Sequence, residues 1–387
     1  MEQGISGKIA KAFIKSKLSI LLMIAFMLLG VFSIYYIPRE EEPQIEVPMA
    51  DIMIGYPGAS PSEMESTVVQ PIEKIVSNIK GVEDVYSTSM NGMAMLTVQF
   101  YVGEDVERSL VKLYNELMKN MDQMPQGVTM PLVKSRSIDD VPVLSFTLWS
   151  DKMGSYQIRQ VAEVLANELK KTPDVAQVKI IGGQNRQVNV WLDKDKMAES
   201  KIDFGIISQS LSANNAQMES GNIITGDAVY SVQTGNFFAN VEEVKNTIVG
   251  TNNGQPVYLY QVATVDDGPK LPDTYVSFGY GAASPKEFGK NPDEYAAVTV
   301  SIAKKKGADA MKLADILINK VDHLKKDLIT NDLNVEVTRN YGLTASHKVS
   351  ELLWHLTIAI LIVTLFVMAA MGWRGGLVVF LSVPITF

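Results

Sequence analysis

Residues 18–37 read LSILLMIAFMLLGVFSIYYI, twenty residues without a charged side chain. A helix needs about 20 apolar residues to cross the hydrocarbon core of a membrane. Four lysines lie before this stretch, and three glutamates, at 40–42, follow soon after it. Positive charge marks the cytoplasmic end of a span. The pattern therefore predicts a transmembrane helix at 18–37, a cytoplasmic segment at 1–17 and export of the chain from residue 38 onward.

A cleavable signal peptide is the alternative interpretation of this stretch. The apolar region of a signal peptide is about 7–15 residues long, and small residues follow it at the cleavage site. Here the apolar run is longer, and it ends in Tyr35, Tyr36, Ile37 and Pro38. We therefore favour an uncleaved membrane anchor.

A second apolar run covers 352–371, where the polar residues are His355, Thr357 and Thr364. It predicts a second membrane helix, which returns the chain to the cytoplasm. Arg374 follows in a turn at 372–376, where a positive charge belongs. A third apolar run, 377–387, gives about half of a span. We expect it to be the start of a third membrane helix, and the chain to be part of a longer protein.

Between the two long apolar runs, hydrophobic periods of two and 3.6 residues alternate, which indicates strands interleaved with helices. The clearest helix begins with Ser60 as its cap, Pro61 in the first helical position and Glu63 completing a capping box. The apolar residues of one helical face follow: Met64, Val68, Ile72, Ile75, Val76 and Ile79. We expect Pro71 to kink this helix and Gly81 to end it.

Strands are predicted on either side of this helix and of one more. The strands are at 47–54, 82–88, 93–102 and 128–134, and the second helix is at 106–121. The order is therefore βαββαβ, the split ferredoxin-like sandwich. This predicts a first α+β subdomain at 38–134.

The same order appears a second time with an interruption. Its elements are strands at 141–149, 176–181, 296–303 and 334–338 and helices at 156–170 and 310–328. The insert has its own alternation: strands at 188–192 and 257–265, a helix at 204–214 and a hairpin at 230–238 with its turn at Thr234-Gly235-Asn236. We predict a second subdomain from 135–182 and 273–345, with a separate subdomain at 183–272. The stretch 279–292 is rich in glycine and proline and predicts a loop.

Composition excludes several classes of protein. The chain has 43 acidic and 35 basic residues and a net charge of −8, which argues against nucleic-acid binding because phosphate contact needs a cationic face. It has no cysteine, which excludes disulfides and thiol nucleophiles. Its three histidines are too scattered for a histidine-built metal site.

No catalytic constellation is evident, so we expect neither enzymatic activity nor a cofactor. The pairs Asp139-Asp140 and Asp266-Asp267 are interpreted as solvated turn carboxylates, because adjacent side chains point apart. The run 304–306 is three lysines, interpreted as exposed because no phosphate-binding loop accompanies it. His355 lies near the start of a predicted span, and we favour a structural role over proton transfer.

Three methionines, Met90, Met93 and Met95, cluster in one predicted hairpin. Thioethers can bind Cu(I). Since Met93 and Met95 alternate with Ala94 and Leu96, we favour ordinary packing and expect no metal site.

Several segments of the sequence are distinctive in combination: PREEEPQI at 38–45, GYPGASP at 55–61, VQPIE at 69–73, GV at 81–82 with YSTS at 86–89, VYLYQVATV at 257–265 and KKGADA at 305–310. With these segments the chain resembles the N-terminal half of a resistance-nodulation-division (RND) efflux pump of the acriflavine-resistance type. These segments follow the family order along the whole chain.

The resemblance implies an α+β membrane protein with two ferredoxin-like porter subdomains, the second interrupted by a docking subdomain. It implies a homotrimer in the lipid bilayer of the bacterial inner membrane, with a large periplasmic domain. The implied partners are a periplasmic adaptor protein and an outer-membrane channel. The implied activity is proton-driven export of small amphiphilic substrates from the periplasm or the membrane.

The resemblance also suggests functional residues. The porter halves must move relative to each other, and we predict a hinge at 133–141 that includes Lys134, Arg136, Asp139 and Asp140. Two positions that align with aromatic substrate-path residues of the family are Val141 and Ile181, where an aliphatic lining would lose ring stacking. The proton-relay carboxylates and lysine of the family lie in later spans, and none is expected in these residues.

Two alternatives remain open. A heavy-metal exporter of the same superfamily, for copper or zinc, is the first. A two-span extracytoplasmic sensor is the second, but the five-residue turn at 372–376 leaves no room for a signalling linker.

Overall fold

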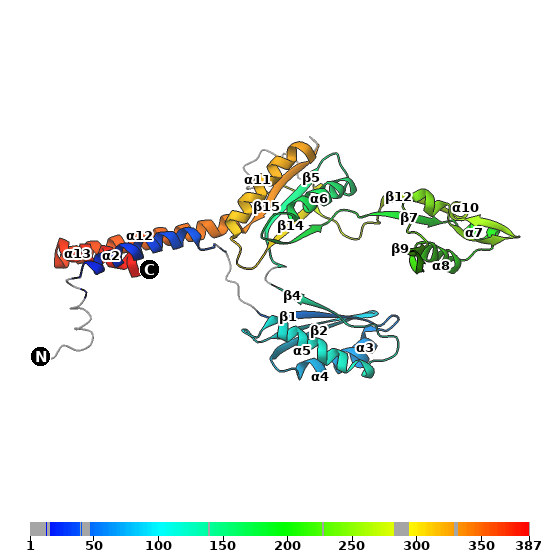
Figure 1. Cartoon of the computed structure of the whole chain (residues 1–387), viewed down its shortest axis with the longest axis horizontal. Coiled ribbons are helices and arrows are strands. Elements are labelled where there is room, and N and C mark those ends of the chain that lie inside the picture. Colours follow the sequence, from blue (N-terminus) through cyan, green and yellow to red (C-terminus); the bar gives the residue numbers. More distant parts are fainter. Residues whose placement is uncertain are drawn as a thin grey trace. The chain divides into compact units, whose positions relative to one another are not determined.

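The computed structural model describes residues 13, 16–38, 40, 47–137, 140–226, 228–281, 294–328 and 332–386. The chain divides into two compact units. The first comprises Met1–Leu148, Glu163–Ile180 and Thr299–Phe387, and the second Trp149–Ala162 and Ile181–Val298. Elements carry the labels of Figure 1.

The first sandwich lies in the first unit. Its elements are β1 (Met49–Gly55), α3 (Pro61–Met64), a π-helical turn (Glu65–Val69), α4 (Gln70–Ser77), β2 (Val82–Met90), β3 (Met93–Phe100), α5 (Val106–Lys119) and β4 (Leu132–Arg136). The strands form an antiparallel sheet of order β2-β3-β1-β4, and α4 and α5 cover one of its faces (Figure 1). This confirms the predicted βαββαβ order.

Strand alternation determines which side chains enter the core of this sandwich. Ile52 on β1 lies opposite Leu96 on β3, and both are completely buried. Their face of the sheet also carries Ala50, Ile54, Ala94, Val98 and Phe100, which pack with Met64, Val68, Ile72, Val76 and Leu113 from the helices. Burying a large apolar side chain contributes about 1.5–3 kcal/mol. The core therefore holds the helices to one face and leaves the other face open.

The start of the first helix follows the predicted capping box. The Ser60 hydroxyl accepts a hydrogen bond from the Glu63 N–H at 3.3 Å, and the Glu63 carboxylate accepts one from the Ser60 N–H at 2.8 Å. The bond from the Ser60 backbone, and then that from its hydroxyl, lower the pKa of Glu63. Pro71 is preceded by the π-helical turn, since proline has no N–H for the carbonyl of residue 67.

Replacing Ser60 with alanine should destabilise this helix by about 1 kcal/mol, because an N-cap hydroxyl satisfies a free backbone N–H. Hydrogen-exchange mass spectrometry of peptides from 61–77 would measure the loss. Ser62→Ala, at an exposed position two residues further on, is the matched control. Equal protection in the two variants would contradict the capping role.

The second sandwich repeats the order of the first. Its elements are β5 (Pro142–Ser150), α6 (Ser155–Lys170), β6 (Val175–Ile181), β14 (Tyr295–Lys304), α11 (Ala310–Leu328) and β15 (Asn334–Asn340). The sheet order is β13-β14-β5-β15, with β6 also on β14, where β13 is the short strand Ser277–Phe278. The Thr147 hydroxyl lies 2.9 Å from that of Thr299 and 3.0 Å from that of Thr338. This confirms the predicted interrupted βαββαβ order.

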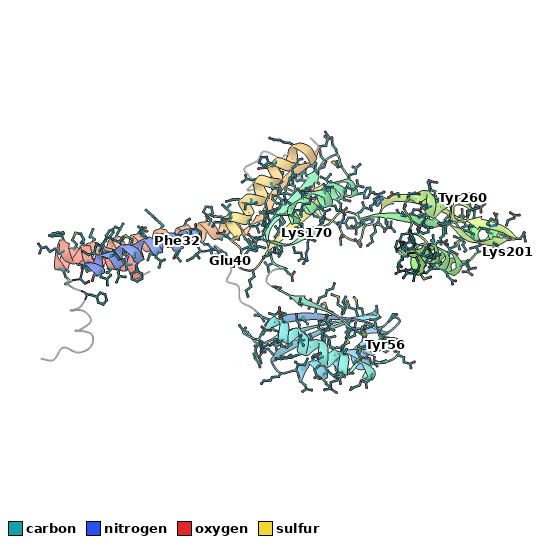
Figure 2. The ribbon with its side chains drawn as sticks, in the orientation of Figure 1. Phe32, Glu40, Tyr56, Lys170, Lys201 and Tyr260 are labelled. Carbon is teal, nitrogen blue, oxygen red and sulfur yellow. The ribbon has the colours of Figure 1, made fainter. Side chains whose placement is uncertain are left out.

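Lys304 at the end of β14 is not part of an exposed run as predicted. Its side chain is buried, and its Nζ lies 2.9 Å from Oε1 of Glu40, which Figure 2 labels. A buried lysine requires a partner of opposite charge. The pair therefore ties the segment that follows the first apolar helix to the end of β14.

The insert lies in the second unit and has a core of its own. Its elements are β7 (Arg186–Leu192), α7 (Lys194–Ser200), α8 (Phe204–Asn214), β8 (Met218–Thr225), β9 (Ala228–Thr234), α9 (Val241–Lys245), β10 (Ile248–Asn252), β11 (Gln255–Tyr258), α10 (Leu259–Val262) and β12 (Ala263–Pro269). Figure 2 labels Lys201, which follows α7, and Tyr260 on α10. Val249, Leu259 and Val262 are completely buried at the centre of this core.

Two predictions for the insert are wrong. The hairpin is formed by β8 and β9, which close at the pair Thr225–Ala228, and Gly235 lies beyond its last strand. Every residue of β8 is exposed, so no alternation of hydrophobicity indicated a strand there. The strand predicted at 257–265 is interrupted by α10, whose Leu259 and Val262 both turn into the core.

Three apolar helices belong to the first unit: α2 (Lys17–Tyr36), α12 (Tyr341–Met371) and α13 (Trp373–Thr386). Among the described helices, α12 is long and apolar enough to span a membrane, and α2 and α13 contain shorter apolar stretches, Leu18–Gly30 and Trp373–Ile385. The helix α13 packs against both α2 and α12. Many side chains on these helices are exposed and apolar, a surface that water does not favour.

The last two helices begin earlier than the apolar runs that predicted them. Helix α12 begins at Tyr341 and contains the predicted span at 352–371, and Asn340 caps it by accepting a hydrogen bond from the Leu343 N–H at 3.0 Å. The expected turn at 372–376 is shorter, since Gly372 separates α12 from α13 and Arg374 already lies in α13.

Candidate substrate path and hinge

The predicted hinge begins at a strand that is fixed to its sheet. The Arg136 Nε donates a hydrogen bond to Oδ2 of Asp51 at 2.7 Å, and Asp51 also accepts one from the Thr97 hydroxyl at 2.7 Å. Asp51 is buried, and Lys134 lies opposite it in the β1–β4 register. The end of β4 is therefore anchored, and any freedom of the connection begins after Arg136.

The connection that follows contains a short turn. The Asp140 N–H donates to the Ser137 carbonyl at 3.0 Å, and the Asp140 carboxylate accepts from the Ser137 N–H at 3.1 Å. Asp139 lies outside the described residues. Strand β5 starts two residues after Asp140.

The two residues of the predicted substrate path lie at strand ends. Val141 immediately precedes β5 in the first unit and is 39% exposed. Ile181 is the last residue of β6, belongs to the second unit and is 50% exposed. Each side chain thus adds exposed aliphatic surface to its own unit.

Two glycines after Ile181 fix the direction in which the chain enters the insert. Gly182 and Gly183 have φ of +83° and +72°. A Cβ at Gly182 would lie 2.5 Å from the Val276 side chain, and one at Gly183 would lie 2.7 Å from Cβ of Arg159. The Arg159 guanidinium donates to the Gly182 carbonyl at 2.6 Å. Side chains cannot be accommodated here, so the glycine pair and Arg159 hold the end of β6.

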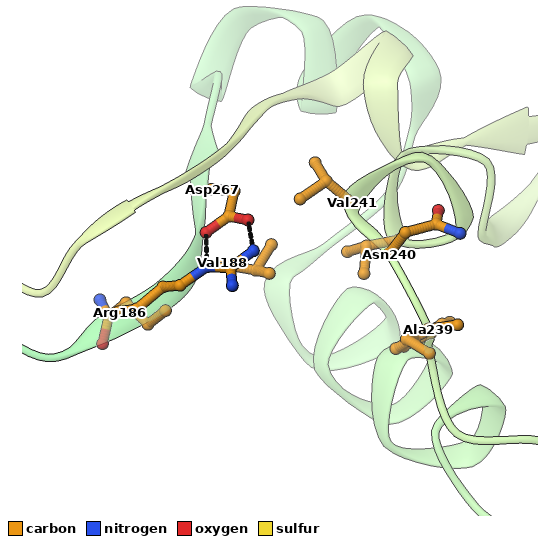
Figure 3. A pocket seen from close by; sticks show the side chains of 9 residues that line it. Arg186, Val188, Ala239, Asn240, Val241 and Asp267 are labelled. Carbon is orange, nitrogen blue, oxygen red and sulfur yellow. Dashed lines mark hydrogen bonds and ion pairs between the residues drawn. The ribbon is translucent and has the colours of Figure 1, made fainter. Parts of the chain in front are cut away.

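A cleft of about 280 Å³ lies in the second unit (Figure 3). Its lining comprises Arg186, Gln187, Val188, Phe238, Ala239, Asn240, Val241, Val244 and Asp267. Arg186 forms two hydrogen bonds with the Asp267 carboxylate, one of them from Nε at 2.8 Å. Asn240 and Val241 stand on the opposite wall. The Arg186–Asp267 ion pair thus forms part of one wall of the cleft, and apolar side chains lie beside it.

The ion pair changes the ionisation of both partners. The hydrogen bonds from Arg186, and then its charge, lower the pKa of Asp267, and the same contacts raise the pKa of Arg186. The two side chains are 29% and 67% exposed. An exposed pair contributes only modestly to stability, and this one joins β7 to β12.

Asp266 and Asp267 are exposed, as predicted, but they lie on a strand and not in a turn. Both residues lie on β12, and Asp266 accepts hydrogen bonds from the Trp191 Nε1 at 2.8 Å and the Asn189 Nδ2 at 3.2 Å. Their side chains point apart, as expected for neighbours on a strand. Arg186 is 81 residues from Asp267 in the chain, and the sequence carried no signal for this pairing.

Acid should weaken the pairing of β7 with β12. The pKa of Asp267 is lowered in the folded chain, so its contribution is present above the unfolded pKa, about 3.9, and is lost as pH falls through the lowered value. ¹⁹F NMR of the chain labelled with 5-fluorotryptophan would follow Trp191 during urea unfolding. In the native chain, the urea concentration at which the Trp191 signal shows half unfolding should decrease when the pH is lowered below about 4. It should decrease less in Asp267→Asn. If the native chain and Asp267→Asn respond equally to acid, the ion pair does not stabilise the pairing of β7 with β12. Glu107→Gln, which removes a carboxylate from α5, is the control and should respond like the native chain.

Among the described residues, no three His, Cys, Asp or Glu side chains gather closely enough to hold a metal ion.

The sequence matches the AcrB/AcrD/AcrF family over residues 9–387. It is also similar to proteins named "Multidrug resistance protein MdtC" from Yersinia pseudotuberculosis serotype O:1b (strain IP 31758) and Yersinia pestis bv. Antiqua (strain Angola). The identity is 25% over 369 residues, which cover 95% of this chain. The chain spans 35% of the length of these relatives.

Proposed function

Because the chain belongs to the AcrB/AcrD/AcrF family of RND multidrug efflux transporters, we propose that it is the N-terminal portion of a proton-driven exporter of amphiphilic compounds. The match over residues 9–387 carries this proposal. The order of the elements supports it, since two βαββαβ sandwiches, the second interrupted by an insert, lie between apolar helices. The proposed protein is a transporter of the inner membrane and not an enzyme.

The proposed topology places three apolar helices in the membrane. In it α2 and α12 cross the bilayer and α13 begins a third crossing, while the segments 1–17 and the turn at Gly372 face the cytoplasm. The first sandwich would be porter subdomain one, and the second sandwich would be porter subdomain two. The insert at 183–272 would be the docking subdomain. Exposed apolar side chains such as Leu361, Leu365 and Phe366 support this reading of α12.

The proposed assembly is a homotrimer that works with a periplasmic adaptor and an outer-membrane channel. Substrates would enter from the periplasm or the membrane and pass Val141 and Ile181. Movement between the porter subdomains would be taken up in the predicted hinge at 133–141, at its end beyond Arg136, because the ion pair of Arg136 with Asp51 anchors β4.

The topology can be tested with single cysteines, since the chain contains none of its own. Lys201→Cys should react with a membrane-impermeant maleimide in cells whose outer membrane is permeabilised. Arg374→Cys should react after the inner membrane is broken. Labelling of residue 201 from the cytoplasmic side would overturn the proposal.

The transport function can be tested with the full-length protein that contains this chain. Its expression in a host lacking efflux pumps should raise tolerance to dyes and detergents, and a protonophore should abolish dye export. Tolerance to copper or zinc without tolerance to dyes would instead favour the heavy-metal exporter.

Replacing Ile181 with phenylalanine should strengthen export of aromatic dyes. An aromatic pair contributes about 0.5–1.5 kcal/mol beyond burial, which corresponds to a roughly two- to tenfold change in affinity. The measurement is dye export by the full-length protein, with an aliphatic detergent as the insensitive substrate. Val164→Phe, at an exposed position on α6, is the control. An Ile181→Phe protein that matches the control would exclude Ile181 from the path.

A further inference from the structure

The open face of the first sandwich carries a group of methionines. The four are Met53 on β1, Met90 on β2, and Met93 and Met95 on β3. None belongs to the buried core between sheet and helices. Met90 and Met93 are 39% and 45% exposed, and Met53 and Met95 are half-buried. Ala94 and Leu96 occupy the core face of β3, so Met93 and Met95 lie on the opposite face.

The strand register makes these four residues neighbours. Met53 lies directly opposite Met95, and Met90 lies directly opposite Met93. Residues opposite each other in an antiparallel pair share a face, with Cβ atoms about 4.5–5.5 Å apart. Met93 and Met95 are two residues apart on one strand, which is a rise of about 7 Å on the same face. The four side chains thus form a contiguous group, which we call the methionine quartet.

The backbone beneath the quartet is fixed. The Tyr56 N–H donates to the Gly92 carbonyl at 2.8 Å, and the Gly92 N–H donates to the Ala59 carbonyl at 2.9 Å. These bonds hold the hairpin between Met90 and Met93 against the loop that follows β1. The residue opposite Met93 on β1 is Gly55, whose N–H donates to the Thr129 hydroxyl at 2.8 Å, so the Thr129 side chain lies beside the quartet at this position. The strand positions are therefore set before any ligand binds, while the flexible thioethers can adjust.

We propose that the methionine quartet is a binding site for a soft monovalent cation, Cu(I). Thioether sulfur selects Cu(I) over hard or borderline cations, which prefer carboxylate and imidazole ligands. The nearest acidic side chain along β1 on this face is Asp51, and it is engaged by Arg136 and Thr97. The ligands of this site would therefore be neutral thioether sulfurs. Neutral donors are suited to a cation with a single charge. The site goes beyond the proposed export of amphiphiles, since binding needs no transport.

The test uses the whole chain purified in detergent, with Cu(I) delivered against a chromogenic chelator. The variant replaces Met53, Met90, Met93 and Met95 with leucine, which removes sulfur and nearly conserves volume. The control replaces four other methionines, Met118, Met153, Met197 and Met218, with leucine. The native chain and the control should bind one Cu(I) at least tenfold more tightly than the quartet variant. Equal binding by all three proteins would overturn the site.

X-ray absorption of the Cu(I)-loaded native chain gives a second measurement that does not depend on how well the variant folds. At least two sulfur scatterers should surround the ion. A shell of nitrogen and oxygen alone would overturn the proposal. Because binding is measured on the purified chain, loss of the site and failure of the export function are distinguishable.

Discussion

A leucine in place of Gly342 is expected to separate α12 from α11 and to cost about 3 kcal/mol, the upper end of the usual range for overpacking. A Cβ at Gly342 would lie 2.6 Å from the Ala310 carbonyl oxygen and 2.8 Å from Cα of Met311. Both are backbone atoms, which cannot rotate out of the way. Gly342 and Ala345 are the buried residues of this first part of α12, so the contact depends on small side chains.

Hydrogen-exchange mass spectrometry of the chain in detergent would measure this effect. Peptides from 310–328 and 334–345 should lose protection in Gly342→Leu, while peptides from the first sandwich keep theirs. Gly30→Leu is the matched control, because it is also a glycine within an apolar helix and a Cβ there meets no atom within 4 Å. If the two variants are equally protected, the close approach of α12 to α11 does not stabilise the fold.

Replacing Phe100 with alanine should destabilise the first sandwich by about 3–5 kcal/mol, because it removes a buried ring and leaves a cavity. Phe100 is completely buried at the end of β3, and its N–H donates to the Pro48 carbonyl at 2.9 Å. The alanine variant keeps the backbone bond, so the loss would report the ring.

Urea unfolding followed by hydrogen exchange in peptides from 49–100 would measure the loss, since other parts of the chain can unfold separately. Tyr101→Ala is the control, at the next position, where the side chain is 55% exposed. A loss below about 1 kcal/mol for Phe100→Ala, the level of an ordinary surface change, would contradict the assigned core.

The first sandwich could be predicted from the sequence because strands such as β1 bury mainly one face, whereas β5 of the second sandwich is buried along almost its whole length. The alternation of Ile52 and Ile54 with Met53 on β1, and the spacing of Met64, Val68 and Ile72 on the helix, are direct consequences of that burial. The capping box of Ser60 and Glu63 was predictable because it depends on residues three apart.

The remaining errors arose where burial does not decide the structure. Strand β8 is exposed along its length, so its pairing with β9 left no periodic pattern. The bonds of Arg186 to Asp267 and of Arg136 to Asp51 join residues 81 and 85 positions apart, and depend on strand register. The sequence showed that the methionines of β3 alternate with Ala94 and Leu96. It did not show which set faces the helices.

The continuity of β15 with α12 has a mechanical consequence. Strand β15 ends at Asn340 and the helix begins at Tyr341. The strand and the apolar helix are therefore joined directly, with no loop residue between them. With 31 residues, the helix is about 46 Å long at 1.5 Å per residue. A tilt of α12 by about 10° would move its far end by roughly 8 Å. Because no loop lies between them, the tilt would act directly on β15, the edge strand of the second sheet.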